Sequence, residues 1–273
     1  MEHRARLVAT VAHMDIDGSK ILVTGASGGL GIAITRELAR RGAKVTITAR
    51  NVAQLEALAR ETGAEVVVAD LSDRSDLDRL CSLAEDMDVV VANAGTGGDV
   101  PVAEADAAHV DFMIDVNLRS PILLATAFAQ AKLKNSARGQ IVTIGSLSGI
   151  TASPETRMYN ATKFGLRGFS LALRQDLDAA GIGVTVVEPG FIRDAGMFAN
   201  SEIELPKGVR TKSPQDVADA VVKAIESNPA EIFVAPVEMR VAATLGSVAP
   251  GLSEMVQRRV GAGDMKRGAA ATS

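Results

Sequence analysis

The chain has 273 residues, of which 47% are hydrophobic and 23% are charged, and its formal net charge is −4. This length favours one large α/β domain over two, and the charge excludes the strongly basic surface that is typical of nucleic-acid-binding proteins. The single cysteine, Cys81, excludes an internal disulfide and is typical of a reducing compartment.

Residues 1–18 are interpreted as an N-terminal arm that precedes the first expected strand. They do not have the pattern of a secretory signal, because the apolar run 7–12 contains only six residues. No run in the chain approaches the ~20 apolar residues that a membrane-spanning helix needs. We therefore expect a cytoplasmic protein without a transmembrane segment.

Short Val- and Ile-rich runs alternate with helical patterns from residue 20 onward. The expected strands lie at 21–23, 45–48, 66–68, 89–91, 141–144, 184–187 and 232–234. The first expected helix ends near 41, and the others cover about 52–61, 74–85, 110–134, 155–180 and 214–226. Unbroken apolar runs are typical of strands buried on both faces, and helices between strands imply right-handed crossovers. The pattern predicts one Rossmann-type domain over residues 19–236, a doubly wound parallel sheet of about seven strands with helices on both faces.

The chain beyond residue 190 is less regular. A segment at 191–213 contains Phe191, Met197, Phe198 and Ile203, and it is interpreted either as a substrate loop for a hydrophobic substrate or as ordinary packing. Residues 237–273 are interpreted as a C-terminal extension. Its apolar residues between 238 and 260 are compatible with an extra helix interrupted at Pro250, and its end is expected to be disordered.

Glycine and polar residues follow six of the expected strands directly. They are the segment 25–31, Arg50, Asp70, Asn93, Ser146 and the pair Pro189-Gly190. In open parallel sheets, ligands bind outside the carboxyl ends of the strands. Six separate segments are therefore expected to converge on one edge of the sheet.

The first of these segments reads Thr24-Gly25-Ala26-Ser27-Gly28-Gly29-Leu30-Gly31. Its glycines permit a tight turn and a close approach of the backbone to a pyrophosphate, and the following helix start supplies amides and a positive dipole. A tight strand-to-helix connection without a ligand is the alternative. The position after a buried strand and before a helix favours a dinucleotide site.

The residue after the second strand bears on which dinucleotide binds. An acidic residue there would bind a ribose 2′-hydroxyl, but the chain has Arg50, which could pair with a 2′-phosphate. The sequence therefore predicts NADP(H) in preference to NAD(H), with a solvated surface arginine as the alternative. Asp70 could accept a hydrogen bond from the adenine amino group or cap the next helix.

Tyr159, the only tyrosine, is followed one helical turn later by Lys163. Residues at this spacing share a helix face, so the lysine charge is expected to lower the pKa of the phenol and make it a usable acid and base. Ser146 could hydrogen-bond a substrate oxygen, with Ser148 as a competitor, although either could simply form a turn. Asn117, in an apolar helical pattern, could bend the helix and hold a water near Lys163 or be structural.

In these motifs the chain resembles the short-chain dehydrogenase/reductase family, over roughly residues 19–236. The resemblance implies that Tyr159 is the general acid and base, that Lys163 binds the nicotinamide ribose, that Ser146 polarises the carbonyl, and that Asn117 holds a water. It implies a set of cofactor-binding residues, namely Gly25, Ser27, Gly29, Leu30, Gly31, Arg50, Asp70, Leu71, Asn93, Ala94, Gly95, Tyr159, Lys163, Pro189, Gly190 and Ile192.

The implied function is an NAD(P)-dependent oxidoreductase that interconverts a carbonyl and a secondary alcohol on a small molecule, without a metal site. The resemblance also implies a homodimer or homotetramer. The alternative is a dinucleotide-sensing binding protein with little turnover, although a sensor needs neither Ser146 nor Tyr159 to bind the adenine half of the cofactor.

Overall fold

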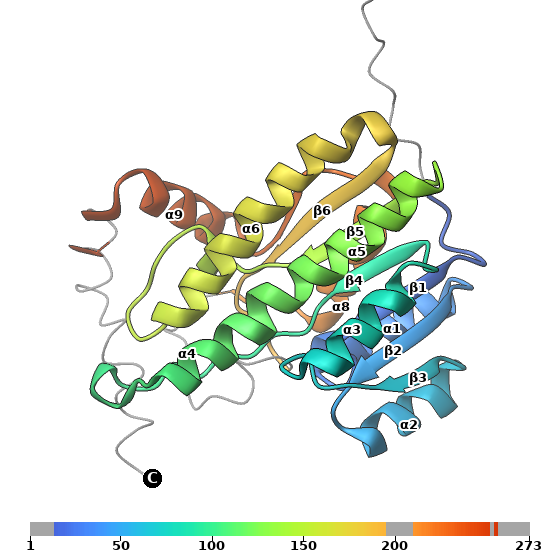
Figure 1. Cartoon of the computed structure of the whole chain (residues 1–273). Coiled ribbons are helices and arrows are strands. Elements are labelled where there is room, and N and C mark those ends of the chain that lie inside the picture. The colour runs from blue at the N-terminus through green and yellow to red at the C-terminus, as the bar shows by residue number, and fades with distance from the viewer. Residues whose placement is uncertain (1–13, 195–209, 252–253, 256–273) are drawn as a thin grey trace, which may run out of the picture.

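A computed structural model describes residues 14–194, 210–251 and 254–255, and its centre is a parallel sheet of seven strands (Figure 1). The strands are β1 Lys20–Thr24, β2 Lys44–Ala49, β3 Glu65–Val68, β4 Val89–Ala92, β5 Gly139–Ile144, β6 Ile182–Pro189 and β7 Glu231–Val234. Their order in the sheet is β3-β2-β1-β4-β5-β6-β7, and all neighbours pair in parallel. The predicted doubly wound sheet is confirmed.

Helices cover both faces of this sheet (Figure 1). On one face lie α1 Gly29–Arg40, α2 Val52–Thr62 and α8 Pro214–Ser227, and on the other lie α3 Arg74–Ala84, α5 Ser120–Lys134 and α6 Arg157–Leu177. Two further helices, α4 Ala107–Ile114 and α9 Val237–Val248, extend beyond the carboxyl ends of the strands. Alternate residues of the strands pack into two separate apolar cores, one on each face of the sheet, because successive side chains point to opposite faces.

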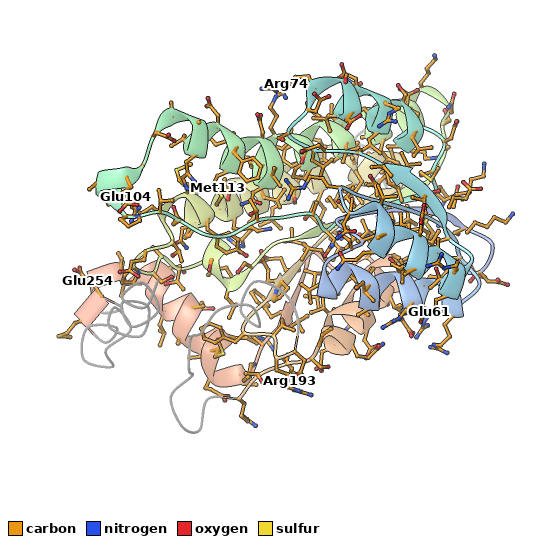
Figure 2. All side chains as sticks on the ribbon, turned by 90° about the horizontal axis from the view of Figure 1, so that it is seen from below. Glu61, Arg74, Glu104, Met113, Arg193 and Glu254 are labelled. Carbon is orange, nitrogen blue, oxygen red and sulfur yellow. The ribbon has the colours of Figure 1, made fainter. Side chains whose placement is uncertain are left out.

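Figure 2 shows how the side chains divide between these cores and the surface. Glu61 and Arg74 point outward from the helices that cover the sheet, whereas Met113 lies inside the fold and is 1% exposed. Several helix starts are fixed by local polar side chains. At α8, for example, Ser213 and Asp216 cap each other's backbone amides in a capping box.

The helix expected over 110–134 is interrupted. Between α4 and α5, residues Asp115–Arg119 form one π-helical turn that contains Asn117. The stretch 107–134 is also the one part of the described chain that is long and apolar enough to span a membrane by length and composition alone, although it contains no uninterrupted run of about 20 apolar residues. Its mean hydropathy is high although charged residues interrupt every apolar run. Leu124 and Phe128 on α5 are buried in the second core, and this packing accounts for the composition.

Parts of the expected arm and extension lie within the described residues. Ile16 is 3% exposed and packs in the first core, so residues 14–18 are attached to the domain. The extra helix expected after 238 is α9, which ends before Pro250. Residues 1–13, most of the expected substrate loop and the expected disordered tail lie outside the described residues.

Candidate active site

A large cavity lies at the carboxyl ends of the strands and has a volume of about 1590 Å³. It is lined by residues that follow β1, β2, β3, β4, β5 and β6, together with one face of α9. The structure therefore brings all six predicted segments to one edge of the sheet, as the chain-order pattern indicates.

The glycine segment forms the turn from β1 into α1. Gly25 has a φ of +66°, and a Cβ at Gly31 would lie 2.3 Å from the Gly25 carbonyl oxygen, so both positions require glycine. Helix α1 begins at Gly29 without a side-chain cap in the described residues and without an acidic residue in its first turn. Ser27, Gly28, Gly29 and Leu30 line the cavity at this point. An uncapped helix start beside a cavity fits the pyrophosphate of a dinucleotide.

Asn93 braces this turn from the neighbouring strand. Its Nδ2 donates to the carbonyl oxygens of Thr24 and Gly25 at 2.9 and 3.2 Å. The backbone amides of Asn93 and Ala94 both donate to Oγ1 of Thr24. The Asn93 side chain, expected among the cofactor-binding residues, is therefore used to hold the glycine turn, although Asn93, Ala94 and Gly95 all line the cavity.

Arg50 and Asp70 lie together at the adjacent strand ends. Arg50 Nη1 is 3.9 Å from Asp70 Oδ2, and the Arg50 side chain is 67% exposed. Asp70 Oδ1 accepts from the amide and hydroxyl of Ser72. Burial opposes ionisation of Asp70, but these hydrogen bonds lower its pKa. The cap of α3 is Asp73, so Asp70 is not the helix cap and its second oxygen faces Arg50.

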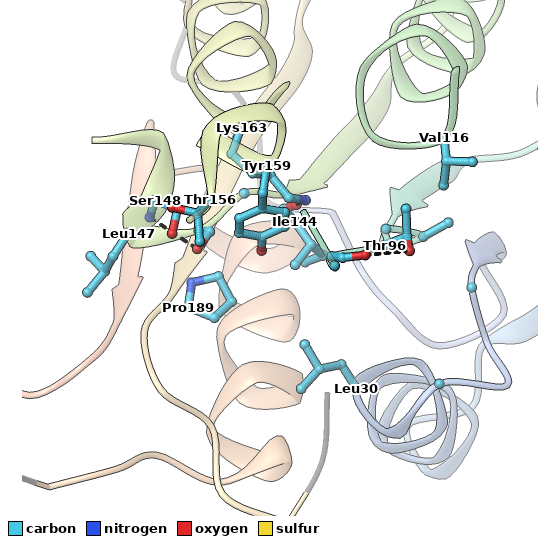
Figure 3. A pocket seen from close by; sticks show the side chains of 18 of the residues that line it. Leu30, Thr96, Val116, Ile144, Leu147, Ser148, Thr156, Tyr159, Lys163 and Pro189 are labelled. Atoms are coloured by element: carbon cyan, nitrogen blue, oxygen red, sulfur yellow. Dashed lines mark hydrogen bonds between the residues drawn. The ribbon is translucent and has the colours of Figure 1, made fainter. Parts of the chain in front are cut away.

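Tyr159 and Lys163 project from the same face of α6, and Figure 3 shows them side by side in the cavity. The Lys163 Nζ donates to the Ile144 carbonyl oxygen at 2.8 Å and lies 5.7 Å from the centre of the Tyr159 ring. Burial lowers the pKa of Lys163 to about 8. Burial also raises the pKa of Tyr159 to about 12, against the lowering effect of a Ser146 hydrogen bond.

The direction of the Tyr159 shift differs from the sequence expectation, which had Lys163 lowering that pKa. Partial burial of the phenol outweighs the favourable interaction with Ser146. The nearby negative group, Glu188, adds to the increase. In this structure Tyr159 is therefore a protonated phenol at neutral pH.

Ser146 lies at the turn after β5, close to Tyr159. Its Oγ accepts from the Ser148 amide at 3.1 Å, and its own amide donates to Glu188 Oε2. The competitor, Ser148, also lines the cavity, and its carbonyl accepts from Asn160 Nδ2. Asn160 and Ser148 thus fix the loop in which Ser146 stands.

Asn117 is fully buried in the π-helical turn. Its side-chain amide accepts from the Thr96 amide at 2.7 Å and donates to the Thr96 carbonyl at 2.8 Å. The helix contains a π-helical turn at this point, and the Asn117 side chain is held by the backbone after β4. A Cβ at Gly95 would lie 3.4 Å from Asn117 Oδ1 and 3.5 Å from Lys163 Nζ, so these three residues meet at one point.

The residues after β6 close the remaining side of the cavity. Pro189, Gly190 and Ile192 all line it. The Gly190 amide donates to the Val234 carbonyl oxygen, and Ile192 forms an isolated bridge with Lys212. Leu71, which the resemblance includes among the cofactor-binding residues, lines the cavity and is 9% exposed.

Sequence reasoning missed two acidic residues of this site, Glu188 and Asp99. Glu188 is fully buried beneath Ser146, and a carboxylate inside an otherwise Val-rich strand, directly before Pro189, was the available signal. Asp99 lies in the glycine-rich loop after β4 and accepts from the backbone amides that begin α6. No local pattern marks this contact, because the two segments are distant in the sequence.

Comparison with known proteins agrees with this geometry. Residues 19–205 match the family model described as short chain dehydrogenase. The chain is 33% identical over 217 residues to the 3-oxoacyl-[acyl-carrier-protein] reductase FabG of Rickettsia bellii, covering 76% of this chain and 89% of that protein.

Two solved structures have the same fold. A short-chain dehydrogenase from Sphingobium yanoikuyae in complex with NADPH has a TM-score of 0.73 at 26% identity, covering 86% of this chain and 95% of that one. A bulky-bulky ketone specific alcohol dehydrogenase from Comamonas testosteroni has a TM-score of 0.71 at 25% identity, with coverages of 86% and 94%. The chain thus belongs to the short-chain dehydrogenase family of NAD(P)-dependent oxidoreductases.

Proposed function

We propose that this protein reduces the carbonyl group of a hydrophobic substrate to a secondary alcohol, with NADP(H) preferred over NAD(H). The observation that carries the proposal is the meeting of Ser146, Tyr159 and Lys163 in one cavity with the glycine turn, because a phenol beside a serine hydroxyl and an ammonium group can give a proton to a carbonyl oxygen.

The residues that would hold the cofactor are those of the strand edge. The amides at the start of α1 would bind the pyrophosphate, and Arg50 would bind a 2′-phosphate. Asp70 Oδ2, beside Arg50, would accept from the adenine amino group. When bound, the nicotinamide supplies the hydride for the carbonyl carbon.

The chain's own groups act on the carbonyl oxygen. Ser146 donates a hydrogen bond that orients this oxygen, and Tyr159 transfers its proton to it as negative charge develops. Lys163, protonated below about pH 8, places a positive charge beside the phenol while Tyr159 loses that proton. Asn117 holds the Thr96 backbone next to Gly95, where Asn117 and Lys163 also meet.

The substrate end of the cavity supports a hydrophobic substrate. Val116, Leu147, Met239, Ala242 and Leu245 line it, mostly with apolar atoms. The Rickettsia relative is a 3-oxoacyl carrier-protein reductase and the Comamonas neighbour acts on bulky ketones. Substrates of these two kinds, 3-oxoacyl thioesters and bulky ketones, are therefore the first to test.

The cofactor preference is tested by titrating the purified protein with NADPH and with NADH and following cofactor fluorescence. We expect Arg50→Ala to weaken NADPH binding by at least about tenfold while NADH binding changes little, because a charge-assisted contact to a phosphate is worth about 1.5–3 kcal/mol. The control is Arg60→Ala, which removes an exposed arginine of α2 that does not line the cavity. Equal losses for both cofactors would refute the preference.

The enzyme is distinguished from a dinucleotide sensor by Tyr159→Phe. This variant should bind NADPH as the wild type does and lose turnover by several orders of magnitude, because it lacks the proton donor. Tight NADPH binding by the wild type with no turnover on any ketone or 3-oxoacyl substrate would favour the sensor.

We also propose that the protein is a cytoplasmic homodimer or homotetramer. Leu133 on α5 and Phe164 on α6 are 50% and 43% exposed, and contact between copies would cover such side chains. Sedimentation analysis would give the stoichiometry, and a monomer at micromolar concentration would refute this part of the proposal.

A further inference from the structure

Glu188 is a fully buried carboxyl group beneath the catalytic residues. It stands at the carboxyl end of β6, in the sequence Val187-Glu188-Pro189, and it packs directly against the turn after β5. A Cβ at Gly145 would lie 2.4 Å from Glu188 Oε2, so Gly145 makes the space for this carboxyl group.

The two oxygens of Glu188 have different surroundings. Oε2 accepts a hydrogen bond from the Ser146 amide, whereas Oε1 is buried and accepts none from the described residues. The Nε of Arg167 is 3.9 Å from Oε1, but this guanidinium directs its hydrogen bonds to Glu231 at 2.7 and 3.1 Å. An incompletely paired buried carboxyl is costly, so a role in the site would explain its presence.

The position of Glu188 relates it to one face of α6. Tyr159, Lys163 and Arg167 follow one another at intervals of four residues and therefore lie along the same side of the helix. Glu188 lies opposite this row, with its hydrogen bond directed to Ser146. It is thus the group that connects Ser146 with the charged face of the catalytic helix.

We propose that Glu188 is a positioning residue of the active site, which fixes Ser146 through its backbone amide and whose charge, when ionised, acts on Tyr159 and Lys163 on the facing helix. The proposal rests on the roles given above to Ser146, Tyr159 and Lys163. It assigns no chemical step to Glu188, which acts on the reaction through these neighbours.

The charges around Glu188 decide how it responds to pH. Burial raises its pKa to about 8, the positive charges of Lys163 and Arg167 on α6 oppose this increase, and Glu231 on β7 adds to it. In return, the Glu188 charge raises the pKa values of both Lys163 and Tyr159. Loss of the carboxylate should therefore lower both of these pKa values.

The only tyrosine of the chain allows a direct test, because the sequence also has no tryptophan. The absorbance of the phenolate during a pH titration reports Tyr159 alone, and it does so without turnover. In Glu188→Gln, an oxygen acceptor for the Ser146 amide remains but the charge is lost. We expect the Tyr159 phenolate to form at lower pH than in the wild type, and the alkaline limb of the kcat profile to move to lower pH as Lys163 loses its proton earlier.

The matched control is Glu37→Gln, which removes a buried carboxylate far from this row, where Glu37 pairs with Arg40 and Arg41. Its phenolate titration and kcat profile should match the wild type. A Glu188→Gln titration that matches the wild type would overturn the charge part of the proposal.

Gly145→Ala tests the contact independently of a substitution at Glu188 and is available if Glu188→Gln does not fold. The added methyl group would displace the carboxyl from the Ser146 amide. We expect kcat to fall about tenfold or more, as for the loss of one hydrogen bond to the site, with the NADPH dissociation constant unchanged. An unchanged kcat would refute the positioning role. If the phenolate shift appears as expected but the wild type turns over no carbonyl substrate, the proposed function fails and the role of Glu188 in setting the pKa of Tyr159 stands.

Discussion

The carboxylate of Asp99 caps the helix that carries Tyr159. Its two oxygens accept from the backbone amides of Met158 and Tyr159 at 3.0 and 3.1 Å, and its side chain is 1% exposed. Thr156, the residue before α6, makes no side-chain cap of its own. The loop after β4 therefore supplies the cap of α6 and fixes the first turn, which carries Tyr159. It also places a negative charge at the start of the helix, where such a charge is favourable.

Removal of this cap should reduce both stability and activity. We expect Asp99→Ala to lower the free energy of unfolding by about 1–2 kcal/mol and to lower kcat as well, because the first turn of α6 holds Tyr159. Urea denaturation and steady-state kinetics measure the two effects. Asp106→Ala is the control, since Asp106 caps α4 through the His109 amide. It should show a similar loss of stability with kcat retained, and an equal loss of kcat in both variants would contradict the positioning role of Asp99.

The glycine turn should not tolerate a methyl group. A Cβ at Gly31 would meet the Gly25 carbonyl at 2.3 Å and the Ala26 Cα at 2.6 Å, both of them backbone atoms. Gly31→Ala should therefore deform the turn and weaken NADPH binding by more than tenfold, as measured by fluorescence titration. Gly168→Ala on α6 has no atom within 4 Å of the added carbon and should instead stabilise the protein by about 0.5–1 kcal/mol. Unchanged NADPH affinity in Gly31→Ala would refute this account of the turn.

The brace from Asn93 should matter to cofactor affinity more than to the fold. Asn93→Ala removes two hydrogen bonds to the carbonyls of Thr24 and Gly25. We expect NADPH affinity to fall about three- to tenfold, because a typical hydrogen bond contributes about 0.5–1.5 kcal/mol. Asn93→Asp should do worse, since it places acceptors against two carbonyl oxygens. Isothermal titration calorimetry with NADPH distinguishes these outcomes, and equal affinity in the wild type and both variants would exclude the bracing role.

Glu188 should make the folded protein less stable as the pH rises. Burial raises its pKa from 4.5 to about 8, so between these values the folded protein binds more protons than the unfolded chain does. Glu188 therefore contributes its full stabilisation below about pH 4.5, and this contribution to the free energy of unfolding is lost as the pH rises to about 8. Relative to the wild type, Glu188→Gln should become increasingly stable over this interval. Urea denaturation at several pH values measures the difference, and a difference that is constant with pH would contradict the prediction.

The parts of the fold and site that sequence reasoning predicted depend on local patterns. Unbroken runs such as Val89–Ala92 identify buried parallel strands, and their alternation with helices determines the topology. The segment from Gly25 to Gly31 and the four-residue interval between Tyr159 and Lys163 are local as well, so their placement in one cavity follows once the strand ends are known.

The parts that could not be predicted depend on contacts between distant segments. The pKa of Tyr159 is raised by burial, which a helical pattern does not reveal. Asn93 contacts Thr24 across 69 positions, and Asp99 contacts Tyr159 across 60. The π-helical turn at Asn117 likewise depends on a distant segment. The Asn117 side-chain amide binds both the N–H and the C=O of Thr96, and these two hydrogen bonds fix the position of Asn117.

That π-helical turn makes residues 115–119 unusually sensitive to a change in chain length. A helical turn with one extra residue is the geometry that remains when a single residue is inserted into an ordinary α-helix. Deleting one residue between 115 and 119 would therefore restore a regular helix without breaking the chain. Because the wide π turn absorbs the extra residue, α4 and α5 would keep nearly the same helical phase, and the change would fall on residues 115–119 themselves. The deletion would move Asn117 away from Thr96. A change that leaves the helix regular would therefore break the hydrogen bonds between this helix and the loop after β4.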